Sequence, residues 1–197
     1  MNNNQKKIKR SFDLVLSFIL LLAFGGVIII AAIIAFFDTR KNGFFKQKRV
    51  GQHGKLFWIY KIRSMKNISG VTTSVTTDSD VRISKLGRVW RKTKIDELPQ
   101  LYNVLLGKMS FVGPRPDVPG YADKLIGDDR IILTIKPGIT GPASIFYRNE
   151  EELLAAQNDP EKYNRDVIYP HKVSINKEYI KNYSFSKDFK YIYKTIF

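Results

Sequence analysis

The sequence predicts a helix-rich α+β fold, with an N-terminal membrane helix followed by one small domain. Three observations support this. Residues 14–37 carry no charge, residues 43–61 alternate loosely in the manner of a short β-hairpin, and the last 25 residues interleave Tyr and Phe with Lys, as amphipathic helices do. A chain of 197 residues is long enough for one domain with a core. We therefore expect a basic tail over 1–13, a membrane segment over 14–37 and a domain over 38–197.

The composition narrows the classes of partner. There are 33 Lys and Arg against 18 Asp and Glu, a formal charge of +15, which favours nucleic acid, anionic lipid or phosphorylated metabolites. Cysteine is absent, which excludes disulfides and thiolate metal sites. The two histidines, His53 and His171, argue against a zinc site built from His.

The uncharged run is long enough for a membrane helix, because a helix needs about 20 apolar residues to cross the hydrocarbon core. A signal peptide fits less well, since its apolar part is usually about 7–15 residues long. Basic residues lie on both sides of the run, and both flanks therefore favour the cytoplasmic side. A re-entrant helix that bends near Gly25-Gly26 satisfies both flanks, and it is the interpretation that we favour. A single span with one disfavoured flank is the alternative.

The elements after residue 38 follow from turn and periodicity signals. Residues 44–48 and 55–60 are predicted to form the hairpin, with Gly51 and Gly54 between them. Residues 68–80 are rich in Ser, Thr and Gly and are expected to form a loop. Helices are predicted over 98–106, ended by Gly107, over 150–157, and over 173–197 as one or two amphipathic helices. Two Pro/Gly-rich stretches, 112–119 and 136–142, are expected to be stiff irregular loops.

Six segments stand out as short motifs in a fixed order. They are Lys9-Arg10-Ser11-Phe12-Asp13, Phe44-Phe45-Lys46-Gln47-Lys48-Arg49-Val50-Gly51, Tyr60-Lys61-Ile62-Arg63-Ser64-Met65, Asp96-Glu97-Leu98-Pro99-Gln100-Leu101, Val112-Gly113-Pro114-Arg115-Pro116 and Pro137-Gly138-Ile139-Thr140-Gly141. In this order and spacing the chain resembles the bacterial polyprenyl-phosphate sugar-1-phosphate transferases, the small monotopic phosphoglycosyltransferases of the sugar transferase family. The resemblance covers nearly the whole chain.

The resemblance implies an activity. Such an enzyme transfers sugar-1-phosphate from a nucleotide-diphosphate sugar, normally a UDP-sugar, to undecaprenyl phosphate and releases the nucleoside monophosphate, UMP for a UDP-sugar. It forms a covalent phosphosugar intermediate, requires Mg²⁺, and works at the cytoplasmic face of the bacterial inner membrane, in the first membrane step of polysaccharide or glycoconjugate synthesis. Nucleic acid is not an expected partner, while the transferred sugar, the glycan and the oligomeric state stay open.

The chain departs from the family pattern at two places. Family members commonly carry Ser-Pro at the membrane bend, where this chain has Gly25-Gly26. After Thr140-Gly141 the family often has Trp-Ala-Gln, where this chain has Pro142-Ala143-Ser144. The second difference is expected to alter the pocket for the donor sugar and to leave the phosphate chemistry unchanged.

Within this resemblance, Asp96 is the expected nucleophile and Glu97 the expected Mg²⁺ ligand. A carboxylate can attack phosphorus, and carboxylate oxygens suit Mg²⁺, which often takes only one or two of them from the protein. A helix that begins near Asp96 should direct N–H groups at an anion and keep this carboxylate ionised. In the plain structural alternative, Thr93 and Asp96 are ordinary capping residues.

Five basic residues are candidates for binding the donor. Arg115 lies in a proline-stiffened turn and can grip phosphate with two N–H groups. Lys61 and Arg63 alternate on a predicted strand and should share one face. Arg91 could orient the carboxylates or bind phosphate, and Arg148 aligns with a family arginine after the Thr-Gly loop. For each of them the alternative is a surface salt bridge or a solvated edge.

The C-terminal aromatic residues allow two interpretations. Tyr lies well at the level of lipid headgroups, and basic amphipathic helices lie in the membrane interface. The alternative is ordinary core packing with Lys outside. The residues concerned are Tyr179, Tyr183, Phe185, Phe189, Tyr191 and Tyr193.

A membrane-anchored basic adaptor or nucleic-acid-binding protein is the rival function. The charge of +15 permits it. The basic residues, however, flank the apolar run and the phosphate-like loops and do not form one dense block. Replacing Asp96 separates the two hypotheses, because an adaptor should tolerate the change.

Overall fold

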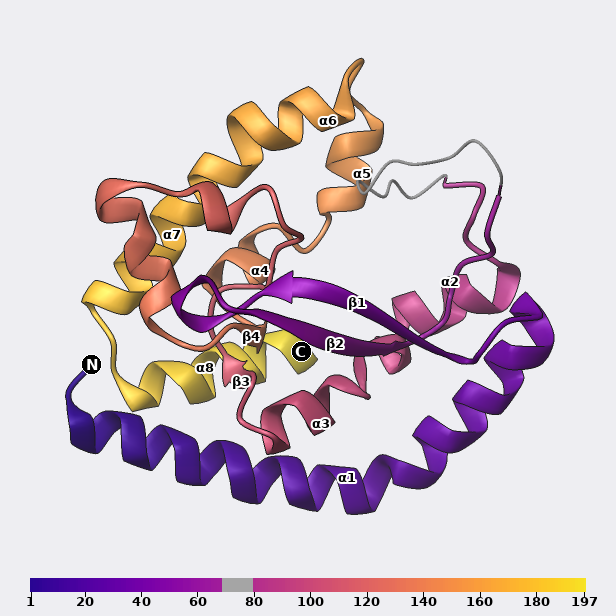
Figure 1. The fold of residues 1–197 in the computed structure, drawn as a ribbon, viewed down its shortest axis with the longest axis horizontal. Helices are drawn as coiled ribbons and strands as arrows, with labels where there is room; N and C mark the ends of the chain where they lie inside the picture. The colour runs from indigo at the N-terminus through magenta and orange to yellow at the C-terminus, as the bar shows by residue number, and fades with distance from the viewer. Residues whose placement is uncertain (69–79) are drawn as a thin grey trace.

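The computed structural model describes residues 1–68 and 80–197 (Figure 1). The loop predicted over 68–80 lies outside the described residues, apart from its two ends. The helices are α1 (Asn3–Thr39), α2 (Lys85–Lys92), α3 (Gln100–Leu105), α4 (Pro142–Phe146), α5 (Glu150–Ala155), α6 (Pro160–Tyr163), α7 (Tyr169–Lys181) and α8 (Phe185–Ile196). The strands are β1 (Phe44–Val50), β2 (Leu56–Ile62), β3 (Ser110–Val112) and β4 (Gly138–Thr140). The short turns are η1 (Gln52–Gly54), η2 (Ile95–Glu97), η3 (Ala122–Lys124), η4 (Gly127–Thr134) and η5 (Asn164–Ile168).

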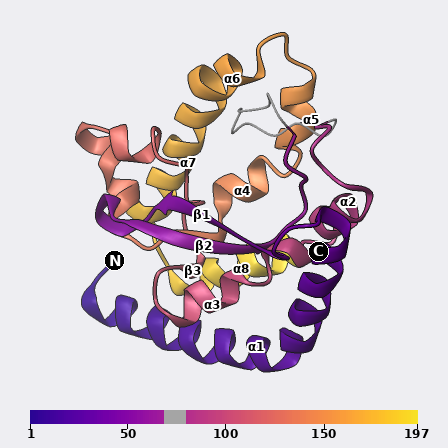
Figure 2. The same ribbon diagram turned by 45° about the vertical axis from the view of Figure 1, so that its right-hand side comes forward.

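The long helix α1 runs along one side of the domain and bends around it (Figures 1 and 2). Its buried residues recur every three or four positions, as at Ile28, Ala31 and Ala35, while most of its other apolar side chains are exposed. Within the described part of the chain, α1 is the one helix long and apolar enough to cross a membrane. Residues 1–13 were expected to be a separate tail, but the helix begins at Asn3 and includes the basic residues.

Both halves of α1 are attached to the same domain. Near its beginning, Lys9 Nζ lies 2.5 Å from the carboxylate of Asp188 in α8. Near its end, Asp38 accepts a hydrogen bond from Ser84, the N-cap of α2. The helix is continuous through Gly25-Gly26. A helix that is held at both ends by one domain has the arrangement that a re-entrant segment requires.

The predicted hairpin is confirmed. Strands β1 and β2 pair antiparallel, with Phe44 opposite Ile62 at the open end. His53 lies in the turn with φ of 59°, as expected for a turn residue. Gly43, just before β1, packs directly on α1, because a Cβ there would lie 1.8 Å from the carbonyl oxygen of Ala32. The hairpin is thereby fixed against the membrane helix.

The free edge of β2 is covered by α3 through Asn103. This buried side chain accepts a hydrogen bond from the Tyr60 N–H at 3.1 Å and donates one to the Trp58 carbonyl at 2.7 Å. These bonds satisfy backbone groups that an edge strand would otherwise leave open. The predicted helix over 98–106 is confirmed, and it begins two residues later because η2 precedes it. Gly107 ends it with φ of +72°.

The two proline-rich loops come together in a way that their sequences do not show. The stretch 136–142 was expected to be irregular, but its residues 138–140 form β4, which pairs in parallel with β3. Glycine allows the close approach, since a Cβ on Gly138 would lie 2.2 Å from the backbone nitrogen of Gly113. This pairing fixes both loops beneath the hairpin.

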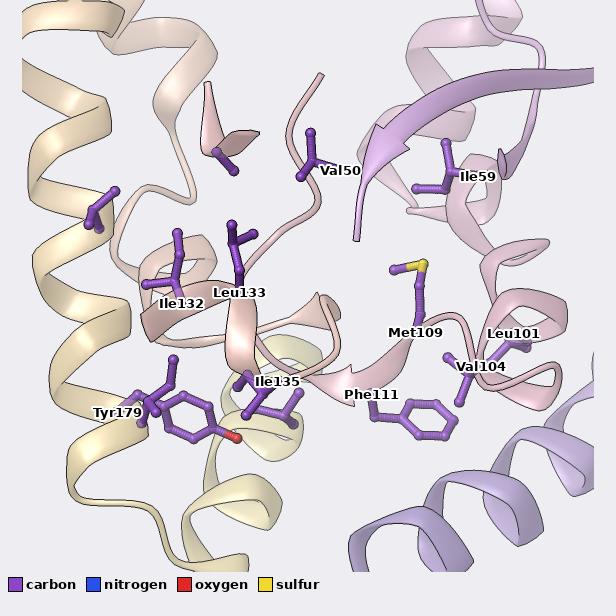
Figure 3. Close-up of a cluster of buried hydrophobic side chains, with 14 residues drawn as sticks. Val50, Ile59, Leu101, Val104, Met109, Phe111, Ile132, Leu133, Ile135 and Tyr179 are labelled. Atoms are coloured by element: carbon purple, nitrogen blue, oxygen red, sulfur yellow. The ribbon is translucent and has the colours of Figure 1, made fainter. Parts of the chain in front are cut away.

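The main core lies between the hairpin, α3, η4 and α7 (Figure 3). Its fully buried members Val104, Met109 and Val112 come from α3 and from the chain just after it. A smaller cluster joins α1 to Ile62 of β2. The core therefore holds β2 and the chain before α3 in fixed positions.

The C-terminal segment forms two helices, α7 and α8, and its aromatic residues divide between the two interpretations. Tyr179 is buried and donates a hydrogen bond to Asp188 at 2.6 Å, so for this residue core packing is correct. Phe189 and Tyr193 are 50% and 64% exposed on α8. Phe189 also packs edge-to-face on the partly buried Phe12 of α1. Aromatic contacts thus join α1 to α8.

Candidate active site

The acidic pair lies in η2, the short turn between α2 and α3. The capping alternatives are wrong. Thr93 donates its hydroxyl hydrogen bond to Val89 at 2.8 Å and closes α2. The N-cap position of α3 is Pro99, and neither η2 nor α3 has a side-chain cap. Asp96 therefore has no capping role.

Asp96 is a buried carboxylate with an unused oxygen. The residue is 5% exposed, and no group in residues 1–68 or 80–197 forms a hydrogen bond with its Oδ1. Burial, followed by the neighbouring charge of Glu97, raises the pKa of Asp96 to about 6. A helix terminus was expected to keep this carboxylate ionised, but desolvation has the larger effect on its pKa and acts in the opposite direction. At neutral pH most of the population is still ionised.

Glu97 is held by two of the predicted cations. Lys61 Nζ of β2 lies 2.9 Å from its Oε1, and Arg115 Nη2 lies 2.5 Å from the same oxygen. Although burial acts to raise it, the pKa of Glu97 is held well below its usual range by Arg115 and Lys61. This carboxylate is therefore ionised, and it orients both cations beside Asp96.

The turn that carries Arg115 is itself held by Arg49, a residue of β1 that was not among the predicted site residues. Arg49 donates to the Pro116 carbonyl at 3.1 Å and to the Gln47 side chain at 2.7 Å. In the described part of the chain, its buried Nε has no hydrogen-bond partner. Burial and the nearby Arg115 lower the pKa of Arg49 to about 10. The available signal was its place in the motif 44–51.

Asp117 is a further residue near the site that the sequence analysis did not identify. It directly follows the Pro-Arg-Pro turn, and burial raises its pKa to about 6, against the opposing charges of Lys172, Arg49 and Arg115. Its backbone carbonyl accepts the hydrogen bond of Val50 N–H at 2.9 Å. An acidic residue immediately after a stiff arginine turn was the signal that could have identified it.

The remaining predicted cations have other partners. Arg63 donates to the Asn42 carbonyl at 2.7 Å and lies over the Phe45 ring at 5.5 Å. Phe45 is the cross-strand partner of Lys61, so the Arg63 side chain that covers Phe45 lies on the same face as Lys61, as expected. Arg63, however, points to the start of the hairpin.

Arg91 and Arg148 are both engaged outside the acidic pair. Arg91 forms an ion pair with Glu151 at the start of α5. Its charge nevertheless opposes the rise in the pKa of Asp96. Arg148 donates to the Lys194 carbonyl of α8. The structure thus brings Lys61 and Arg115 onto Glu97, leaves Arg91 at the margin, and places Arg148 against the C-terminal helix.

The acidic pair fits a Mg²⁺ ion that brings most of its ligands with it. The described residues contain no cluster of three His, Asp or Glu side chains that could hold a metal alone. They do provide two adjacent carboxylates, with one unpartnered buried oxygen on Asp96. Mg²⁺ commonly binds one or two carboxylates together with phosphate oxygens and water. Glu97, and to a lesser extent Asp96, would contact such an ion.

A small hollow adjoins the site and is lined in part by Arg115, Asp117 and Pro114. The larger surface hollow lies at His53 and η4 and shares no residue with the site. The arrangement around Asp96 provides a desolvated carboxylate oxygen, a second carboxylate that is ionised, and cations in fixed positions. These are the groups that nucleophilic attack on a phosphate ester requires.

The chain is similar to known proteins over most of its length. The family model described as "Bacterial sugar transferase" matches residues 4–197. The chain is 34% identical over 95% of its length to an undecaprenyl-phosphate galactose phosphotransferase of Salmonella typhimurium. It is 34% identical over 96% of its length to a UDP-glucose:undecaprenyl-phosphate glucose-1-phosphate transferase of Escherichia coli.

The relatives differ in length. The chain spans 39% of the Salmonella typhimurium and Escherichia coli relatives. It spans 85% of EpsL, an uncharacterized sugar transferase of Bacillus subtilis, with 35% identity over 96% of the present chain. The family match covers the membrane helix, the acidic pair and the Pro-Arg-Pro turn together. The chain belongs to the bacterial sugar transferase family.

Proposed function

We propose that the protein transfers sugar-1-phosphate from a nucleotide-diphosphate sugar, namely a UDP-sugar, to undecaprenyl phosphate and releases UMP. The observation that carries the proposal is the buried Asp96 carboxylate, with its free oxygen beside the Lys61–Glu97–Arg115 group. Relatives at about one-third identity are named as undecaprenyl-phosphate sugar phosphotransferases, which supports the same reaction.

In the first step, an Asp96 oxygen attacks the phosphorus that carries the sugar. A bond forms between this oxygen and phosphorus, and the bond from phosphorus to the bridging oxygen breaks. UMP leaves with that oxygen, and the enzyme retains an acyl phosphate that bears the sugar. In the second step, a phosphate oxygen of undecaprenyl phosphate attacks the same phosphorus and restores the Asp96 carboxylate.

The surrounding groups match the charge that these steps develop. Arg115 can hold an equatorial phosphate oxygen through two N–H groups, and Lys61 supplies a point charge from the strand. Glu97 fixes both cations before the substrate arrives, which lowers the reorganisation that the reaction needs. Mg²⁺, bound at Glu97, would neutralise phosphate charge and favour departure of UMP.

The placement of α1 supports an enzyme at the cytoplasmic face of the inner membrane. Basic residues at both ends of α1 favour that side, and both ends are attached to one domain. A re-entrant α1 would bury its exposed apolar face in lipid, and Phe189 and Tyr193 of α8 would lie near the headgroups. The phosphate of undecaprenyl phosphate lies at the same depth.

The covalent intermediate provides the test. Purified protein is incubated with Mg²⁺ and a panel of UDP-sugars, without undecaprenyl phosphate, and analysed by mass spectrometry after an acid quench. We expect at least one donor to add the mass of its sugar phosphate, with peptide mapping to Asp96. Asp96→Asn should abolish the adduct and UMP release. The control Asp129→Asn, which removes a surface carboxylate paired with Lys177, should retain both.

Two results would contradict the proposal. One is a folded protein that forms no adduct and releases no UMP with any donor of the panel. The other is an Asp96→Asn protein that retains normal turnover. The second result would also favour the rival adaptor function, for which position 96 is unimportant.

A further inference from the structure

A second polar group of side chains lies close enough to Arg115 and Asp117 to act on their charges. It consists of Tyr147 at the end of α4, Glu150 at the start of α5, and His171 and Lys172 in the first turn of α7, and we call it the α4–α7 cluster. Both views of the ribbon show α4 between α5 and α7 (Figures 1 and 2). The cluster thus joins three elements that are separate in the chain.

The members of the α4–α7 cluster hold one another in place. Lys172 Nζ lies 2.6 Å from each oxygen of Glu150 and 5.6 Å from the centre of the Tyr147 ring. The Tyr147 hydroxyl lies 2.7 Å from His171 Nδ1. The Lys172 and Glu150 side chains are 20% and 27% exposed, so they are shielded but still reachable from outside.

Two electrostatic relationships link the α4–α7 cluster to the site. The negative charge of Glu150 contributes to raising the pKa of Arg115, after the larger effect of Glu97. The positive charge of Lys172 opposes the rise in the pKa of Asp117. Glu151, the next residue of α5, pairs with Arg91. The start of α5 therefore lies along the edge of the acidic pair.

We propose that the α4–α7 cluster is the subsite that receives the sugar of the donor, and that it determines which sugar is accepted. This inference rests on the proposed function. The phosphorus attacked by Asp96 carries the sugar through a single ester oxygen. If Arg115 holds that phosphate, the sugar must lie near Arg115. The cluster is the polar group that we assign to this place, because Glu150 acts on the charge of Arg115 and the adjacent Glu151 pairs with Arg91.

The chemistry of the cluster suits a neutral, hydroxyl-bearing ring better than a phosphate. The carboxylate of Glu150 compensates Lys172 and would repel a phosphate. Hydroxyl groups can donate to Glu150 and accept from Lys172 or Tyr147, and the Tyr147 ring offers an apolar surface to the C–H groups of a sugar. A partly buried site built to hydrogen-bond particular hydroxyls discriminates strongly among isomers, because a mismatch leaves its polar groups unpaired.

Binding of donors to the full-length Asp96→Asn protein tests the inference without turnover. Dissociation constants are measured with Mg²⁺ for UDP and for the UDP derivatives of glucose, galactose, N-acetylglucosamine and N-acetylgalactosamine. The quantity compared is the ratio of the UDP constant to that of each UDP-sugar, which isolates the contribution of the sugar. We expect this ratio to exceed unity for the accepted sugar and to differ among the four.

The variants Glu150→Gln and Lys172→Gln should reduce the ratio for the preferred sugar by about tenfold, while the constant for UDP stays within about threefold. His171→Asn changes an exposed side chain, so it keeps the test valid if the other variants fold poorly. The control Lys177→Gln replaces a lysine of similar exposure that also forms an ion pair, further along α7, and should change neither quantity.

Some outcomes overturn the inference. If Lys172→Gln weakens binding of UDP and of all UDP-sugars equally, Lys172 contacts a phosphate and not the sugar. If the variants leave the ratios unchanged, the cluster has only a structural role. The proposed function fails separately. If the wild-type protein releases no UMP but shows the sugar-dependent ratios, the proposed reaction is wrong and the sugar subsite stands. If the protein releases UMP but the variants keep the same sugar preference, the reaction stands and the sugar subsite is wrong.

Discussion

Asp96 and Glu97 are adjacent carboxylates whose pKa values are shifted in opposite directions. Burial raises the pKa of Asp96 to about 6. The cations Arg115 and Lys61 hold the pKa of Glu97 well below its usual range, although burial opposes them. One residue thus carries a poorly compensated charge that suits a nucleophile, and its neighbour carries a strongly compensated charge that suits a fixed ligand.

Asp96→Asn should inactivate the protein and stabilise it. A carboxyl group whose pKa is higher in the folded state favours folding when protonated, and this contribution is lost as pH rises through about 6. At pH 7.5 the ionised Asp96 therefore destabilises the fold, by about 1–3 kcal/mol. Thermal unfolding in detergent should show a higher midpoint for Asp96→Asn than for wild type at pH 7.5, and a smaller difference at pH 4.5. A lower midpoint at both pH values would contradict this view of the site.

Glu97→Gln should inactivate the protein and destabilise it. The substitution leaves the mostly buried Lys61 without its partner and removes the anchor of Arg115. Breaking a buried ion pair at one partner typically costs about 3–5 kcal/mol. Because Arg115 is partly exposed, the expected loss lies at or below the lower end of that range, about 2–3 kcal/mol. Relative to wild type, the unfolding midpoint should fall for Glu97→Gln and rise for Asp96→Asn. A shift of both midpoints in the same direction would refute the opposite roles given to the two carboxylates.

The pH dependence of kcat/KM should have an acidic limb near pH 6. The nucleophile must be ionised, and the pKa of Asp96 is raised to about 6, so activity should fall as pH decreases through that value. Asp117 has a pKa raised to about the same value, which makes its contribution a necessary control. Initial rates of UMP release in Asp117→Asn should retain the limb if Asp96 is responsible. Loss of the limb in that variant would assign it to Asp117.

Much of the fold could be predicted from local signals. The hairpin at 44–62 was indicated by loose alternation and by Gly51 and Gly54 between its strands, and the helix after Pro99 by its end at Gly107; both are confirmed. Strands β3 and β4 could not be foreseen, because each has only three residues and its partner lies far along the chain. The helical start of α1 was also missed, since basic residues before an apolar run resemble a tail, whereas Lys9 and Asp13 are buried against the domain.

The site residues that belong to recognisable motifs could be predicted from the sequence. Asp96, Glu97, Lys61 and Arg115 come together in the structure, as the resemblance led us to expect. The ionisation of Asp96 was not predictable, because it depends on how deeply the fold buries the residue. The same holds for residues whose role arises from contacts across the fold. Arg49 lies within one quoted motif and Asp117 directly follows another, but the sequence does not show that Arg49 holds the turn of Arg115 or that Asp117 is buried.

Arg49→Lys tests whether this buried cation positions Arg115. Lysine keeps the charge but lacks the planar fork whose two nitrogens reach Pro116 and Gln47 separately, so the turn should loosen. We expect kcat to fall by about 10–100-fold with a smaller change in KM, because misplaced catalytic groups affect the transition state most. The control Lys48→Arg changes an exposed cation on the other face of β1 and should have no effect. A pure loss of stability with normal kcat in the folded fraction would exclude a positioning role.

Asp188→Asn should detach the beginning of α1 from the domain. The carboxylate of Asp188 pairs with the buried Lys9 at 2.5 Å and accepts from the Tyr179 hydroxyl at 2.6 Å. Asparagine can still accept from Tyr179 but leaves the Lys9 charge uncompensated, which should cost about 3 kcal/mol of unfolding free energy.

Replacing both partners separates the charge effect from loss of packing. The double variant Lys9→Met with Asp188→Asn removes the isolated charge, so it should be more stable than Asp188→Asn alone by about 1–3 kcal/mol. The control Lys7→Met substitutes an exposed lysine of the same helix and should change stability by less than about 0.5 kcal/mol. Unfolding midpoints of the four proteins in one detergent give the comparison. If the double variant is less stable than Asp188→Asn, the ion pair is not what holds α1 to α8, and packing of Phe12 against Phe185 and Phe189 becomes the better explanation.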